Sequence, residues 1–96
     1  MRREGERLFV RGPVTLANAA SLLEQGAREV REGARTIDLG GVTEIDSSLL
    51  AVMLAWMREA RRAGAAVGFV NLPEGLVTIA RLYGVDGLLG AQDTQP

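Results

Sequence analysis

The chain has 96 residues, of which 47% are hydrophobic and 24% are charged, and its formal net charge is −1. This composition is typical of one small globular domain, and the near-neutral charge argues against nucleic-acid binding through a general electrostatic field. The sequence contains neither cysteine nor histidine. Their absence excludes disulfides, thiolate nucleophiles, a Ser-His-Asp triad and nearly every transition-metal site.

No segment approaches the ~20 consecutive apolar residues of a membrane-spanning helix. The first ten residues, MRREGERLFV, also lack the apolar centre of a signal peptide. We therefore expect a soluble, cytoplasmic protein that does not insert directly into a membrane.

The first half of the chain predicts a strand, a helix and a second strand. Residues 6–11 are apolar in the middle and flanked by turn residues, which is typical of a strand. Over residues 15–33 apolar side chains recur every three or four positions, which predicts an amphipathic helix. Gly26 lowers the stability of that helix by about 1 kcal/mol relative to alanine, so the helix depends on its packing. Residues 35–39 form the next predicted strand, ended by Gly40-Gly41.

The second half repeats this alternation. A helix is predicted over residues 48–63, a strand covered on both faces over 65–70, and a third helix over 73–84. The order β-α-β-α-β-α indicates a single α/β domain, with a small, mostly parallel sheet and about three helices packed on it. We place the domain at residues 5–90 and a loose polar tail at 91–96.

Acids and hydroxyls are concentrated where the second predicted strand leads into the helix over 48–63. Asp46 and Ser47 are residue types that cap a helix by accepting hydrogen bonds from its free backbone N–H groups. A helical wheel places Ser47 at the border of the apolar stripe and Ser48 toward solvent. The wheel therefore predicts that Ser48 is the more exposed of the two serines.

The same helix carries a second apolar stripe, made of Leu49, Val52 and Trp56. Two interpretations remain open. The helix is either buried on two sides, or it presents this stripe to a partner protein, where tryptophan is enriched.

A catalytic interpretation of this segment is weak. Glu44 and Asp46 are paired carboxylates, but acid-base chemistry also needs a cleft and opposed environments for the two groups. Gly40-Gly41 belongs to no phosphate-binding motif, and two acids alone make a weak magnesium site. We therefore predict no catalytic residue, no metal site and no cofactor.

The run Ile37-Asp38-Leu39, followed by Ile45-Asp46-Ser47-Ser48 and by Leu50 at the head of a helix, resembles the STAS domain. This name covers sulfate transporters and anti-sigma-factor antagonists. The closing stretch, residues 76–89 with Leu82-Tyr83, is similar to the small STAS subunit of Mla-type phospholipid ABC transporters.

The resemblance implies a non-catalytic regulatory or assembly subunit. Such a subunit binds the cytoplasmic ATPase within a permease complex that maintains outer-membrane lipid asymmetry, and it lies at the inner membrane through that complex. The partner-binding residues implied at the start of the motif helix are Asp46, Ser47, Ser48, Leu49, Val52 and Trp56.

The other branch of the family implies an anti-sigma-factor antagonist that a partner kinase phosphorylates. Ser48 matches the phosphorylated serine of that branch, and Ser47 is the second candidate. The chain departs from both branches at Leu49, where glycine is usual. Because only residues 1–4 precede Gly5, we expect the first strand of the family to be truncated or missing.

Overall fold

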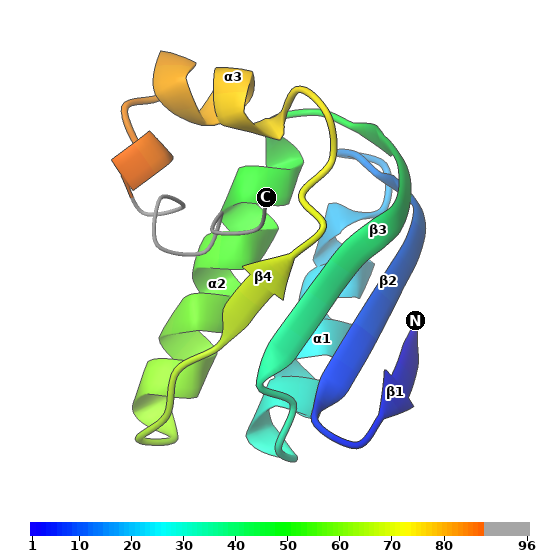
Figure 1. Cartoon of the computed structure of the whole chain (residues 1–96), viewed down its shortest axis with the longest axis vertical. Coiled ribbons are helices and arrows are strands. Elements are labelled where there is room, and N and C mark those ends of the chain that lie inside the picture. The colour runs from blue at the N-terminus through cyan, green and yellow to red at the C-terminus, as the bar shows by residue number, and fades with distance from the viewer. Residues whose placement is uncertain (88–96) are drawn as a thin grey trace.

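The computed structural model describes residues 1–87, and the predicted tail over 91–96 lies outside them. Four strands form one sheet in the order β1-β2-β3-β4, and three helices accompany it. Helices α1 and α2 lie side by side on one face of the sheet, and α3 crosses the end where α2 begins (Figure 1). The elements are β1 (Arg2–Glu4), β2 (Arg7–Val14), α1 (Ala19–Arg31), β3 (Thr36–Ile45), α2 (Ser48–Arg62), β4 (Gly68–Val70) and α3 (Leu76–Leu82).

The pairing of the strands confirms the predicted α/β class. β2, β3 and β4 run parallel, joined by the crossover helices α1 and α2, and β1 is antiparallel to β2. The sheet is therefore mixed and mostly parallel, as expected. The first strand is present but has only three residues.

β3 is longer than predicted, because Gly40-Gly41 does not end it. The strand continues to Ile45, which pairs with Val14 of β2. Two register shifts interrupt this pairing, between Phe9 and Arg11 and between Gly12 and Val14. Glycines are common where a strand bends or bulges, because they tolerate irregular backbone and close approach. Glu44 consequently lies in a strand rather than in a loop.

β4 is shorter than predicted and is not covered on both faces. It spans Gly68–Val70, with Phe69 buried and its two neighbours only half-buried. The long helices lie on one face of the sheet, whereas the opposite face carries no helix among the described residues (Figure 1). The apolar run over 65–70 reflects the edge strand of a sheet that helices cover on one face, rather than a strand between two helical layers.

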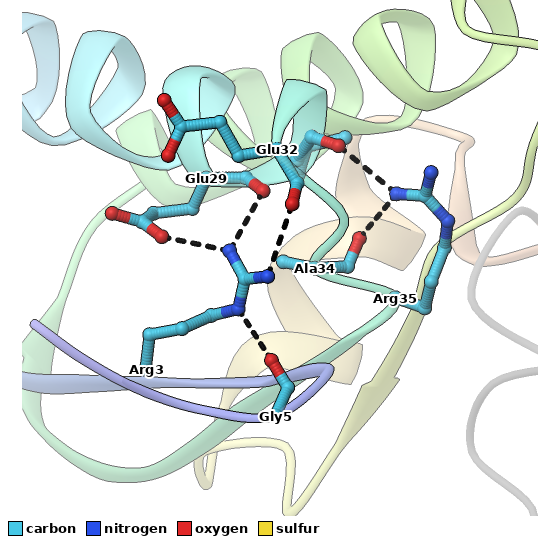
Figure 2. A network of polar contacts seen from close by, with 7 residues as sticks. Arg3, Gly5, Glu29, Glu32, Ala34 and Arg35 are labelled. Carbon is cyan, nitrogen blue, oxygen red and sulfur yellow. Dashed lines mark hydrogen bonds and ion pairs between the residues drawn. The ribbon is translucent and has the colours of Figure 1, made fainter.

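Two arginines fix the carboxyl end of α1 to the sheet (Figure 2). The guanidinium of Arg3, on β1, donates to the carbonyl oxygens of Glu29 and Glu32 and forms an ion pair of 2.9 Å with the Glu29 carboxylate. Arg35 donates to the carbonyl oxygens of Val30 and Ala34 at 2.9 and 2.6 Å. The Glu29 and Val30 carbonyls also accept backbone hydrogen bonds from Ala34 and Gly33, and the cationic donors add to these and suit the negative dipole of the helix end. This contact also holds the short edge strand β1 in place.

Candidate functional site

The Asp46 carboxylate organises the approach to α2. One oxygen, Oδ1, accepts a hydrogen bond of 2.8 Å from the backbone N–H of Ser48, in the first turn of the helix. The other, Oδ2, accepts one of 3.0 Å from the backbone N–H of Leu16, in the connection between β2 and α1. The predicted capping role is confirmed for Asp46, which in addition ties two loops together at one end of the sheet.

These hydrogen bonds also set the ionisation of Asp46. They lower the pKa of the carboxyl below its ordinary value, with the Leu16 N–H as the largest cause and the Ser48 N–H as the next. Partial burial acts in the opposite direction and is outweighed, and the Ser48 side chain adds a smaller lowering. Asp46 is therefore a fixed negative charge beside the two serines.

The two serines are exposed in the reverse of the predicted order. Ser47 is exposed, whereas Ser48 is half-buried. The backbone of Ser47 is already helical, at φ −64° and ψ −15°, and its hydroxyl makes no capping hydrogen bond. Because Asp46 performs the capping, Ser47 is left in the first turn with its hydroxyl free for a partner. The helical wheel predicted the wrong order of exposure because it contains no information on which side of the helix the rest of the chain covers.

Leu49, Val52 and Trp56 are not exposed, and the interpretation of this stripe as a partner surface is wrong in this structure. All three are at most 1% exposed, because α1 packs against this side of α2. The Trp56 indole lies against Gly26, where an added β-carbon would overlap the ring. Its Nε1–H donates to the Leu23 carbonyl oxygen at 3.0 Å. The alternative that α2 is buried on two sides is the correct one.

Among residues 1–87, a different flank of α2 is left uncovered beside the end of α3. A shallow groove of about 350 Å³ is lined by Ser47, Leu50, Ala51, Leu54, Tyr83 and Val85. Leu82 and Tyr83 are 78% and 61% exposed, and Leu16, which hydrogen-bonds to Asp46 through its N–H, is 80% exposed. A groove bordered by an exposed aromatic side chain such as Tyr83 has the character of an interaction surface. We call the groove residues together with Asp46 the open flank.

Most of the open flank is not predicted by the sequence. Ala51 and Leu54 are not among the residues singled out from the sequence, although Leu82-Tyr83 is noted for its family resemblance. Only the position of α3 brings Tyr83 and Val85 next to the first turns of α2. No local pattern in the sequence carries that information.

The described residues contain neither a candidate metal site nor a candidate membrane-spanning helix. Within residues 1–87 no cluster of three or more acidic, histidine or cysteine residues is placed to hold a metal ion. Glu44 is exposed near the end of β3, and Asp46 is engaged by two backbone N–H groups. In the same part of the chain no helix is long and apolar enough to cross a membrane.

Comparison with known proteins agrees with this architecture. The family model described as the Mlab STAS domain matches residues 1–90. The chain therefore belongs to the STAS domain family. Domains of this family are in general regulatory or interaction modules rather than enzymes.

A solved structure shows the same fold. The anti-sigma factor antagonist SpoIIAA in its unphosphorylated form is similar with a TM-score of 0.66 over 91% of this chain and 80% of that chain. Its sequence is 16% identical, so the likeness establishes the fold alone. No curated protein sequence matches the chain significantly.

Proposed function

We propose that the protein is a non-catalytic regulatory or assembly subunit that binds the cytoplasmic ATPase of an ABC-type phospholipid transporter. In this role it would help to maintain outer-membrane lipid asymmetry and would lie at the inner membrane through its complex. The observation that carries the proposal is the match of the Mlab STAS domain over residues 1–90. The ATP, the magnesium and the lipid would bind to other subunits.

The open flank is the docking surface in this proposal. It combines an exposed hydroxyl at Ser47, a fixed charge at Asp46 and exposed apolar area at Tyr83. Interfaces commonly combine an apolar centre with a polar rim. Ser48 is half-buried and contributes only its exposed part to this surface. Leu49, Val52 and Trp56 are buried and stabilise the position of the helix.

Co-purification tests this function. The tagged chain, expressed together with its genomic neighbours, is expected to recover an ATPase, and Ser47→Arg should reduce that recovery by placing a long cation in the contact. Ala63→Arg is the matched control, because Ala63 is exposed at the other end of α2. Absence of an ATPase from the wild-type eluate would contradict the proposal. An equal loss of recovered ATPase with both variants would also contradict it.

A second candidate is an anti-sigma-factor antagonist that is phosphorylated at the start of α2. It is favoured by the likeness to SpoIIAA and by the exposed Ser47 hydroxyl. A phosphate adds a charge of about −1.5 to −2. Beside the ionised Asp46 it would repel an acidic partner surface, while the N-terminus of α2 would tolerate it.

Incubation with a cognate kinase and ATP tests this second candidate. One added phosphate in the intact mass is expected, and the Ser47→Ala and Ser48→Ala variants assign it. Ser48 matches the phosphorylated position by resemblance, whereas Ser47 is the more exposed. An unchanged mass in the presence of a kinase active on its own substrate would count against the antagonist.

A further inference from the structure

A second cavity lies close to the open flank and has different chemistry. Its volume is about 460 Å³, within the range of ligand pockets. It lies between the second half of β3 and the connection from β4 to α3, just past the carboxyl end of β4, the position at which α/β folds bind ligands. Its lining consists of Leu39, Gly40, Val42, Thr43, Ile45, Asn71, Leu72, Pro73 and Glu74.

The two walls of this cavity are held together by one nearly buried carboxylate. Asp38 is 9% exposed, and its Oδ1 accepts hydrogen bonds from the Gly40 N–H at 2.8 Å and from the Asn71 side-chain amide at 3.1 Å. Asn71 has φ 56°, and no other non-glycine residue among the described ones has a positive φ. Asparagine tolerates this left-handed conformation, and its hydrogen bond to Asp38 ties the connection after β4 to β3. The cavity is thus a fixed feature of the fold.

The lining discriminates between ligand charges. Among the described lining residues Glu74 is the one charged residue and none is an arginine, and Thr43 and Asn71 supply further polar atoms. An anion would meet the Glu74 carboxylate without a compensating cation. A cation with several N–H donors would instead find carboxylate, hydroxyl and amide oxygens as acceptors. A planar guanidinium, with five N–H donors, suits such a set better than an ammonium.

We propose that this cavity receives an arginine side chain of the partner ATPase. The proposal rests on the proposed function and deepens it, because Ile45 of the cavity lining directly precedes Asp46 of the open flank. Arginine is among the residues that most often anchor protein interfaces by filling a pocket on the partner. The apolar groove and the acidic cavity then form two parts of one contact, which meet at the start of α2.

Titration of the intact chain with N-acetyl-argininamide, followed by amide NMR, tests the chemistry of the cavity without any partner. The amide signals of Gly40, Thr43, Asn71 and Glu74 are expected to shift. The citrulline analogue has the same shape without the charge, and it should bind at least about tenfold more weakly. N-acetyl-argininamide should bind to the Glu74→Gln variant more weakly by a similar factor. In both cases a charge-assisted hydrogen bond is lost. Glu24→Gln, an exposed change on α1, should leave binding unaltered. Equal shifts with citrulline, or none with arginine, would overturn the proposal.

Recovery of the ATPase tests whether the arginine comes from the partner. Glu74→Gln should lower the recovered ATPase, and Glu24→Gln should not. If Ser47→Arg abolishes recovery while Glu74→Gln leaves it unchanged, the docking function stands and the arginine assignment is overturned. If the wild-type chain recovers no ATPase, the function and the partner assignment both fail, and the titration alone still decides whether the cavity prefers a guanidinium.

Discussion

Helix α2 has two apolar flanks, of which one is buried and the other borders a groove. The flank with Leu49, Val52 and Trp56 is at most 1% exposed, because α1 covers it. The open flank, with Ser47, Ala51 and Leu54, borders a groove completed by Tyr83 and Val85. Both flanks contain apolar residues at helical spacing, so composition does not distinguish them. The difference arises from which neighbouring element is placed against each side.

Gly26 lets the Trp56 ring of the covered flank (Leu49, Val52 and Trp56) pack closely against α1. Its cost to the helix is offset by close packing, since a side chain there would overlap the Trp56 ring. The Trp56 indole also gains a carbonyl partner in Leu23. On the open flank the corresponding surface has no such partner within residues 1–87, and a hydroxyl and a carboxylate lie at its rim. One flank therefore stabilises the fold, and we propose that the other serves recognition.

The largest effect is expected from Trp56→Ala on the covered flank. Removing a fully buried aromatic side chain should lower the free energy of unfolding by about 3–5 kcal/mol. Tyr83→Ala on the open flank is the matched change, and it should stay within about 0.5 kcal/mol because its ring is mostly solvated. Urea denaturation of both variants measures the difference, and comparable losses would contradict the division between the flanks.

Gly26→Ala should be the next largest change. It improves helix propensity by about 1 kcal/mol, whereas overpacking against Trp56 costs about 1–3 kcal/mol, so the net effect should be a loss of up to about 2 kcal/mol. In a Trp56→Ala background the overlap is gone, so the same substitution should become stabilising. A double-mutant cycle in urea measures this reversal of sign. Additive effects would show that Gly26 does not act through the indole.

Asp46→Asn should destabilise the chain in a pH-dependent manner. The folded-state pKa of Asp46 lies below its ordinary value, because the Leu16 and Ser48 N–H groups favour the carboxylate. Its stabilising contribution is therefore present above the unfolded-state pKa and is lost as the pH falls through the folded-state pKa. The difference in unfolding free energy between wild type and Asp46→Asn should shrink on the acid side.

Urea denaturation across that pH range measures this effect. Ser47→Ala serves as the control, since it removes a neighbouring polar group that does not titrate. A gap between wild type and Asp46→Asn that stays constant into acid would contradict the role assigned to the carboxylate.

The smallest effect on stability is expected from Ser47→Arg. An exposed residue without a capping hydrogen bond should tolerate the change within about 0.5 kcal/mol. Its recovery of the ATPase should nevertheless fall, which separates recognition from folding. Thermal denaturation of the purified variant provides this check, and a large loss of stability would remove Ser47 from the recognition surface.

Local patterns were enough to predict the element types, the mostly parallel sheet and the cap at Asp46. They were insufficient where distant segments meet. Gly40-Gly41 has the composition of a strand end, yet pairing with β2 carries β3 through to Ile45. The order of exposure of Ser47 and Ser48, and the burial of Trp56, both depend on where α1 and α3 lie. The cavity with Glu74 joins residues some thirty positions apart through Asp38 and Asn71.

Hydrogen exchange of the chain, alone and bound to the co-purified ATPase, tests the central claim most directly. We predict new protection in the first turns of α2, over residues 48–54, and at Tyr83 to Val85, with the last turn of α2 unchanged. Protection confined to the bare face of the sheet or to the last turn of α2, with the open flank unaffected, would contradict it.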